Sequence, residues 1–324
     1  MVGDVTADGM ADVFVCSATT SWLYRQRHDG TFDSLNHVHP QAHLAAFGYF
    51  KADNRIDIAS LFRFQGAPDV LLIRMQNSAG GFVLQPSQFL PTYWIHSLEA
   101  ADLDGDGYDD IAMTGMVYFN DTPWTGTFGV MLNDGTGAFG NAQWALDSYI
   151  GYWLTIYDID RDGDLDAAVS VYDTYSSGGG NLRVDLHFND GNAQFTRVRP
   201  PNLMTYSQFA TGQDFADLDG DGVTDMTAGS LDTIDVFRGT ESGQNELWQG
   251  FVDFANRHLQ QPTFGDFNGD GNLDLAYLDA PYYDPPDPNA YLVIIPGTCI
   301  HTCPGDANLT GEVDVFDPLE LLIN

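Results

Sequence analysis

The feature that most constrains this chain is a nine-residue acidic pattern, Asp-x-Asp/Asn-x-Asp-Gly-x-x-Asp, that occurs four times in full. The full copies span residues 102–110, 158–166, 217–225 and 266–274. A fifth copy starts at Asp4 with Thr6 in the third position, and a degenerate sixth spans residues 49–57. Because a short apolar run follows each copy at once, the chain is predicted to be an array of similar units.

The six copies start 45 to 59 residues apart, which is the range in which propeller blades repeat. Each unit has one apolar block before the acidic loop, a second directly after it, and a third that usually ends in a glycine-rich turn, as at residues 133–139. Such turns between short apolar runs are hairpin signals. Four antiparallel strands per unit make a blade. We therefore predict an all-β fold, a β-propeller over residues 1–298, with units starting near residues 4, 49, 102, 158, 217 and 266.

The composition agrees with an all-β fold and narrows the range of partners. The chain has 324 residues, 34 glycines and 13% aromatic residues. Its net charge of −34, with only 12 Lys and Arg, argues against nucleic acid as a partner. No apolar stretch approaches the roughly 20 residues that span a bilayer. Met1 stands three residues before the first acidic loop, so we expect a truncated reading frame in which the missing signal peptide says little about secretion.

The clustered carboxylates predict calcium. Two unit charges about 4 Å apart repel by roughly 4 kcal/mol at an effective dielectric near 20, so an unfilled loop would splay. Calcium accepts roughly six to eight oxygens in irregular geometry, whereas magnesium demands a near-ideal octahedron. Positions 1, 3, 5 and 9, with the carbonyl of position 7, would supply that shell for about four to six ions. The predicted side-chain ligands are Asp4, Thr6, Asp8 and Asp12; Asp102, Asp104, Asp106 and Asp110; Asp158, Asp160, Asp162 and Asp166; Asp217, Asp219, Asp221 and Asp225; and Asp266, Asn268, Asp270 and Asp274.

An EF-hand begins with a similar pattern, but its loop needs a bidentate Glu at position 12 and a flanking helix on each side. In the four full copies position 12 is Met113, Val169, Ala228 and Tyr277, all within apolar, strand-like segments. The acidic segments are therefore predicted to be calcium loops of β-hairpins.

With these motifs the chain resembles the FG-GAP or VCBS repeats of integrin α-subunit propellers and of many secreted bacterial proteins. The resemblance covers about residues 1–298. It implies a propeller of about six to seven four-stranded blades, with calcium in the loop between the first and second strands of each blade. It also implies an extracellular or cell-surface location.

The unit at residues 49–57 departs from the pattern, because Tyr49 and Lys51 replace two ligands while Asp53 and Asp57 remain. Either the Lys51 ammonium takes the place of the metal in a salt bridge, or the motif has decayed and the lysine is solvated. Both alternatives predict that this loop binds no calcium.

The last residues, 299–324, resemble one half of a type I dockerin repeat, with a calcium loop followed by the start of a helix. The residues that carry the resemblance are Asp306, Asn308, Thr310, Asp314 and Asp317. It implies a cohesin-like partner. Cys299 and Cys303 are close enough to pair in an oxidising compartment, and a metal site with His301 is the weaker alternative because a fourth ligand is absent. Cys16 is expected to be a buried small apolar residue.

Alternating strand direction places the acidic loops on one face of a blade array and the entries to the first strands on the other. Aromatic residues gather on the second face, and rings with polar tips suit binding surfaces. We therefore predict a ligand, a glycan or a cell-surface protein, with Trp94, Trp124 and Trp153 as the leading contacts, although part of these rings would pack between blades. No catalytic residue is predicted. A polysaccharide lyase using His96, His258 and Arg257, or a purely structural or adhesive repeat protein, remains the alternative.

Overall fold

The structure is a computed structural model, and the described part of it is all-β, with no helix. It describes residues 2–16, 21–39, 42–63, 68–90, 92–117, 125–147, 149–172, 182–200, 204–205, 210–218, 221–230, 233–239, 245–252, 257–267, 271–281 and 291–296.

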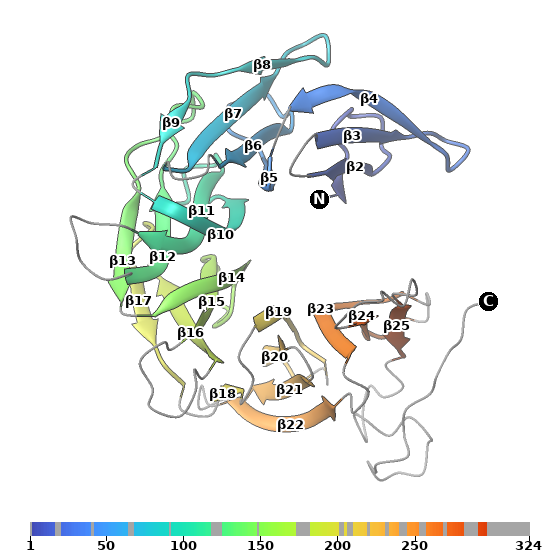
Figure 1. Cartoon of the computed structure of the whole chain (residues 1–324), viewed down its shortest axis with the longest axis vertical. Helices are drawn as coiled ribbons and strands as arrows, with labels where there is room; N and C mark the ends of the chain where they lie inside the picture. The colour runs from blue at the N-terminus through green and yellow to red at the C-terminus, as the bar shows by residue number, and fades with distance from the viewer. Residues whose placement is uncertain are drawn as a thin grey trace. The chain divides into compact units, whose positions relative to one another are not determined.

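In the described residues six antiparallel sheets follow one another along the sequence, and the main strands of each sheet are neighbours in chain order (Figure 1). The first sheet contains β1 (Val2–Gly3), β2 (Asp12–Val15), β3 (Ser21–Gln26) and β4 (Phe32–His39). The second contains β5 (Leu44–Gly48), β6 (Asp57–Phe62), β7 (Val70–Gln76), β8 (Phe82–Leu84) and β9 (Gln88–Phe89). The third contains β10 (Thr92–Ala101), β11 (Asp110–Val117), β12 (Thr125–Met131) and β13 (Gln143–Asp147).

The remaining three sheets repeat this order. The fourth contains β14 (Ile150–Tyr157), β15 (Asp166–Tyr172), β16 (Leu182–Asn189), β17 (Phe195–Val198) and β18 (Met204–Thr205). The fifth contains β19 (Ala210–Ala216), β20 (Asp225–Ser230), β21 (Thr233–Gly239) and β22 (Asn245–Val252). The sixth contains β23 (Arg257–Gly265), β24 (Asp274–Pro281) and β25 (Tyr291–Ile295). Six successive sheets of this kind fit the blades of a β-propeller, as predicted.

The chain divides into two compact units, which are described separately below. The first comprises Met1–Ile156, Gly163–Val169 and Asn189–Thr196, and the second comprises Tyr157–Asp162, Ser170–Phe188 and Arg197–Asn324.

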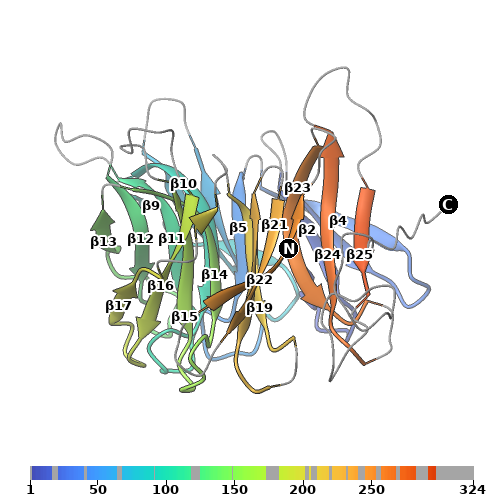
Figure 2. The same ribbon diagram turned by 90° about the horizontal axis from the view of Figure 1, so that it is seen from below.

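Each acidic segment forms the loop between the first and second strands of its sheet, as the sequence predicts. The Asp at position 9 is the first residue of the second strand and pairs with the last residue of the first strand, as in Gly48↔Asp57 and Ala101↔Asp110. The strands run up and down between two sets of loops, as β11 and β12 do in Figure 2. The motif therefore marks the turn of the first hairpin in each sheet.

The second strand of a sheet is the most deeply buried. In β6 five consecutive residues from Asp57 are buried, and in β15 six are, beginning at Asp166. A strand covered on both faces reads as a continuous apolar run rather than an alternating one. This explains why the apolar blocks behind the acidic loops show no clear period of two.

Aromatic edges join neighbouring sheets of the first unit. Phe50, which is fully buried, meets Phe139 with ring centroids 5.1 Å apart, and Phe128 meets Phe195 at 4.9 Å. Both pairs are edge-to-face, the arrangement that aromatic quadrupoles favour. One core cluster also contains Leu61 of the second sheet and Ile111 of the third.

Candidate metal centre

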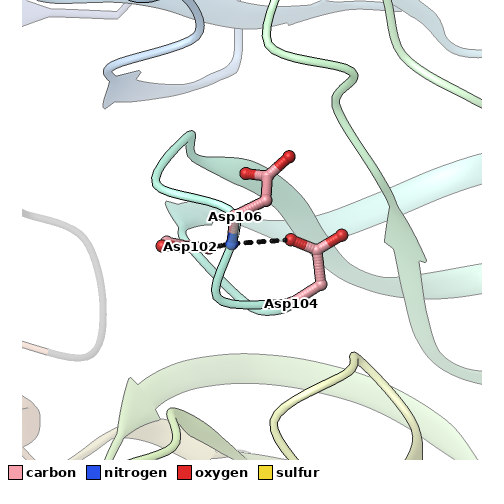
Figure 3. Close-up of side chains that lie close together, drawn as sticks. All are labelled: Asp102, Asp104 and Asp106. Atoms are coloured by element: carbon pink, nitrogen blue, oxygen red, sulfur yellow. Dashed lines mark hydrogen bonds between the residues drawn. The ribbon is translucent and has the colours of Figure 1, made fainter.

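The loop from Asp102 to Asp110 gathers three carboxylates. Asp102, Asp104 and Asp106 each offer an oxygen, and the three oxygens lie within 4.8 Å of one another. Figure 3 shows the Asp104 and Asp106 side chains on the turn, with dashed lines from the Asp106 backbone nitrogen to the carboxylates of Asp102 and Asp104. Those two hydrogen bonds are 3.1 and 3.2 Å long. The turn itself therefore orients the acidic groups.

The same backbone contacts recur in other loops. The carboxylate at position 1 accepts a hydrogen bond from the backbone N–H of the glycine at position 6, with lengths of 2.9 Å at Asp102, 2.8 Å at Asp4, 3.1 Å at Asp217 and 3.0 Å at Asp266. That glycine has a positive φ, for example 90° at Gly107, which explains its presence in the motif.

The donor set fits calcium. All predicted ligands are oxygens, the ligands that this hard cation prefers. Within the described residues, Oγ1 of Thr6 at position 3 and Oδ1 of Asp217 at position 1 are buried and have no hydrogen-bond partner. This is expected of oxygens that would bind a metal ion.

Several predicted ligands lie outside the described residues. They are Asp219, Asn268 and Asp270, and the whole C-terminal set Asp306, Asn308, Thr310, Asp314 and Asp317 with Cys299 and Cys303.

The Asp at position 9 has a structural role that the motif did not reveal. Asp110 is completely buried; one carboxylate oxygen accepts the Leu103 N–H at 3.1 Å and the other accepts the Asn133 N–H at 2.8 Å. Asp225 does the same with Leu218 at 2.8 Å and Gly239 at 2.9 Å. The carboxylate thus ties the acidic loop to the end of the third strand. Burial raises the pKa of Asp110 to about 6, although both backbone N–H groups act to lower it.

A second tether, which sequence reasoning missed, joins neighbouring sheets of the first unit. Asn133, two residues after the end of β12, donates from Nδ2 to the Phe50 carbonyl at 2.9 Å. Asn189 donates likewise to the Leu103 carbonyl at 2.8 Å. In both cases the acceptor is at position 2 of the preceding acidic loop. The repeated Asn-Asp-Gly at residues 133–135 and 189–191 was the available signal, but it reads as turn chemistry alone.

Two arginines of the second unit approach the loop that starts at Asp217. Arg161 lies 3.4 Å from the Asp217 carboxylate and donates to Thr224 Oγ1 at 3.2 Å, while Arg238 lies 3.0 Å from Asp221. These side chains are partly exposed, so each ion pair contributes little to stability.

The opposite end of the first unit holds the predicted aromatic face. Trp94, near the start of β10, is 44% exposed, whereas Trp153 is half-buried and Trp124 lies outside the described residues. His96 stacks on Tyr152 with ring centroids 4.5 Å apart, and its Nδ1 lies 2.8 Å from the Gly151 carbonyl oxygen. Burial lowers the pKa of His96.

Arg63, which donates to the backbone of the residue after Trp94, is already paired with a carboxylate. Arg63 pairs with the buried Asp69 at 3.0 Å and donates to the Ile95 carbonyl at 2.7 Å. The side chains of Arg257 and His258 are not described. Cys16 is half-buried against Phe14 and its neighbours rather than fully buried as predicted, because it follows the last residue of β2.

The comparisons with known proteins support the repeat and the fold. The family model described as FG-GAP-like repeat matches residues 49–113 and 217–277. No curated protein matches the sequence. The described residues contain no helix long and apolar enough to cross a membrane.

Two solved structures are similar over most of their length. A crystal structure of BBS1N in complex with ARL6DN has a TM-score of 0.52 at 10% identity, and the match covers 86% of this chain and 73% of that one. A variant of Synechocystis apocarotenoid oxygenase has a TM-score of 0.50 at 13% identity, with 90% and 68% covered. At such identities the likeness concerns the fold alone. Two segments of the chain therefore match an FG-GAP-like repeat, and the described all-β residues fit a β-propeller.

Proposed function

We propose that this protein is a secreted, calcium-stabilised β-propeller that binds a glycan or a cell-surface protein through the ends of the blades opposite the acidic loops. The observation that carries the calcium part is the convergence of Asp102, Asp104 and Asp106 in a loop whose pattern recurs along the chain.

Calcium would be held by positions 1, 3 and 5 of each acidic loop, with the position 7 carbonyl. When bound, the ion supplies positive charge that offsets the repulsion among the carboxylates. Position 9 contributes differently, because Asp110 already accepts two backbone hydrogen bonds and anchors the loop to the strand behind it. Calcium is therefore proposed to be architectural.

The ligand would bind at the other end of the blades. β10 has 10 residues, and at about 3.3 Å per residue it places its start roughly 30 Å from the acidic loop at its end. The exposed Trp94 ring supports this assignment, since sugar rings and apolar protein surfaces both stack on such rings.

Lyase chemistry is supported less well by the described side chains. Arg63 is neutralised by Asp69, and the Nδ1 atom of His96 lies at the Gly151 carbonyl. A base and a free guanidinium able to meet a uronate carboxylate are not brought together there.

The experiment is a glycan-array screen of the calcium-loaded protein, with an absorbance assay for unsaturated products on any polysaccharide that binds. Binding without new absorbance supports the proposal. Growth of absorbance favours a lyase, and absence of binding favours a structural or protein-adhesion role.

Two matched substitutions that each remove one aromatic ring test which end of the blades binds the ligand. Trp94→Ala should weaken binding by about tenfold, the effect of losing one stacking ring worth roughly 1.4 kcal/mol. Tyr49→Ala is the control, because Tyr49 is similarly exposed, at 47% against 44% for Trp94, but lies on an acidic loop. Equal effects of the two changes would contradict the assignment.

The C-terminal residues 299–324 add a separate proposal, that a dockerin-like segment binds a cohesin-like partner. It rests on the sequence resemblance alone, and a pull-down with a cohesin module in calcium tests it.

A further inference from the structure

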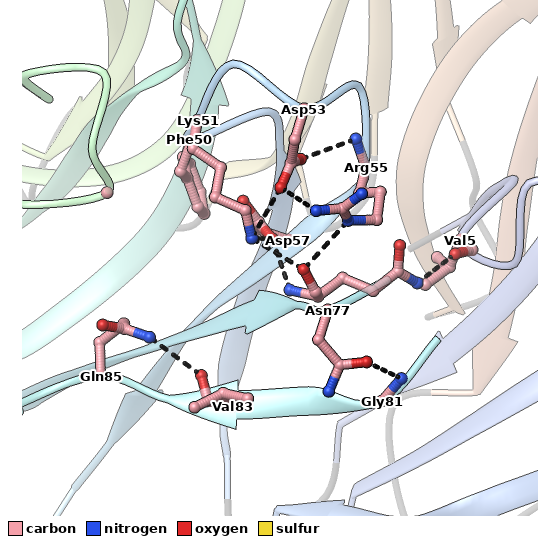
Figure 4. A network of polar contacts seen from close by, with 12 residues as sticks. Val5, Phe50, Lys51, Asp53, Arg55, Asp57, Asn77, Gly81, Val83 and Gln85 are labelled. Carbon is pink, nitrogen blue, oxygen red and sulfur yellow. Dashed lines mark hydrogen bonds and ion pairs between the residues drawn. The ribbon is translucent and has the colours of Figure 1, made fainter. Parts of the chain in front are cut away.

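The degenerate loop at residues 49–57 contains two cations where the other loops contain acids. Lys51 Nζ lies 3.0 Å from Asp53 Oδ2 and 3.6 Å from Asp57 Oδ1, and it donates to the Gln76 carbonyl at 2.7 Å. Arg55 pairs with Asp53 and donates to the same carbonyl at 3.2 Å. Figure 4 shows the Lys51 and Arg55 side chains converging on Asp53, with Asp57 beside them.

The backbone of this loop keeps the form of the acidic loops. Asn54, at position 6, has a φ of 53°, where the other loops have glycines of positive φ such as Gly107. Asn is among the residues that tolerate this region best. Asp57 is fully buried at position 9 and accepts the Gln76 N–H at 2.7 Å, as Asp110 accepts the Asn133 N–H. The sequence change therefore altered the charges while the loop retained its shape.

The charges of this loop balance without a metal. Residues 49–57 hold two cations, Lys51 and Arg55, and two carboxylates, Asp53 and Asp57. Residues 102–110 hold five carboxylates and no cation. The Lys51 side chain is 22% exposed and that of Asp53 is 19% exposed, so water screens these ion pairs less than it screens surface pairs.

We infer that the Lys51 ammonium, supported by Arg55, replaces the calcium ion in this loop, so that the second sheet is held by a built-in cation. A dication could enter only by displacing an ammonium that pairs with the Asp53 carboxylate, donates to the Gln76 carbonyl and lies 3.6 Å from Asp57 Oδ1. This settles the two readings of the sequence in favour of the ion-paired one. The second sheet then keeps its acidic-loop geometry when calcium falls, whereas the loops that lack a cation depend on the ion.

Hydrogen–deuterium exchange of the full-length protein in calcium and in chelator tests the inference. Amides of residues 49–57 should exchange at the same rate in both buffers. Lys51→Met, which keeps the length of the side chain and removes its charge, should accelerate that exchange by about tenfold or more in both buffers. Arg27→Met is the control, because it removes an exposed cation from the β3–β4 turn and should leave residues 49–57 unchanged.

Two results would overturn the inference: slower exchange of residues 49–57 in wild-type protein when calcium is added, or wild-type exchange there in Lys51→Met. Both results are independent of the proposed function. Whether calcium stabilises the loops that lack a cation is measured in the same spectra, by the exchange of the peptide covering residues 102–110. A second variant, Tyr49→Asp with Lys51→Asp and Arg55→Asn, restores the acidic positions and removes both cations. It should bind one more calcium ion than wild type in a calorimetric titration, and an unchanged count in the folded variant would contradict the inference.

Discussion

Replacing Asn133 by Ala tests whether side-chain amides tether neighbouring sheets. Asn133 is 4% exposed and makes three hydrogen bonds with its side chain. Nδ2 donates to the Phe50 and Asp109 carbonyls at 2.9 and 3.1 Å, and Oδ1 accepts the Gly137 N–H at 3.2 Å. Truncation leaves these backbone groups without that partner.

The expected magnitude follows from those three bonds. A buried hydrogen bond contributes about 1 kcal/mol net, so Asn133→Ala should lower the free energy of unfolding by about 3 kcal/mol. For 324 residues with an unfolding entropy of about 2.1 cal/mol/K each, this corresponds to a fall in Tm of about 4 °C. Urea denaturation and calorimetry in saturating calcium measure the two quantities.

Matched variants separate the tether from a general effect of losing an amide. Asn189→Ala should cost about 2 kcal/mol, because its Nδ2 donates to two carbonyls, those of Leu103 and Leu165, at 2.8 and 3.1 Å. Asn192→Ala should cost less than about 0.5 kcal/mol, since Asn192 is exposed and bonds only within its own turn, to Asp190. A loss at Asn133 no larger than that at Asn192 would refute the reasoning.

Three further predictions concern the blades and their loops. Burial raises the pKa of Glu99 to about 7 from an unfolded value near 4.5, so its ionisation opposes folding as pH rises through that interval. The Glu99→Gln variant should therefore be as stable as wild type below pH 4 and up to about 3 kcal/mol more stable above pH 7. Urea denaturation at a series of pH values measures this difference. Equal pH profiles of the two proteins would contradict this. Gly115→Ala should lower the free energy of unfolding by more than about 2 kcal/mol in the same assay, because a Cβ there would lie 2.3 Å from the Trp94 carbonyl oxygen. Gly140→Ala is the control and should cost under about 1 kcal/mol, because the atom nearest to its Cβ would lie 3.7 Å away. Arg161→Gln should tighten calcium binding at one site about tenfold by removing a cation 3.4 Å from Asp217, and an unchanged calorimetric titration would contradict this.

The fold was predictable because its signals are local. The Asp and Gly spacing of residues 102–110 encodes a turn whose hydrogen bonds join residues two to seven positions apart, such as Gly105 to Asp102 and Leu103 to Asp110. The apolar run behind each turn then specifies the strand. These relationships survive in a single sequence, and in the described residues the second strand of each sheet begins at the last Asp of a motif.

The tethers were not predictable in the same way. Asn133 bonds to a residue 83 positions away and Asn189 to one 86 positions away, and nothing local distinguishes them from ordinary turn residues. The exposure of the aromatic residues was also not predictable, because it too depends on residues far away in the sequence. Trp94 and Trp153 both stand near the entry to a first strand, yet only Trp94 is exposed, because burial depends on the neighbouring sheet.

Lys51 lies between these two cases. Its replacement of a ligand was visible in the sequence, but whether its ammonium faced the carboxylates depended on the side-chain direction. The 3.0 Å contact with Asp53 and the 2.7 Å bond to the Gln76 carbonyl supply that direction.

The most direct test of the central claim is the melting temperature of metal-stripped protein titrated with calcium, with magnesium as the control. An ion that binds only the folded state adds about 2.7 kcal/mol per site at 100 times its Kd, which for this chain is about 4 °C for each filled loop. The account predicts a Tm that rises with calcium over several such steps and rises much less with magnesium. A Tm that is the same in chelator and in saturating calcium would contradict it.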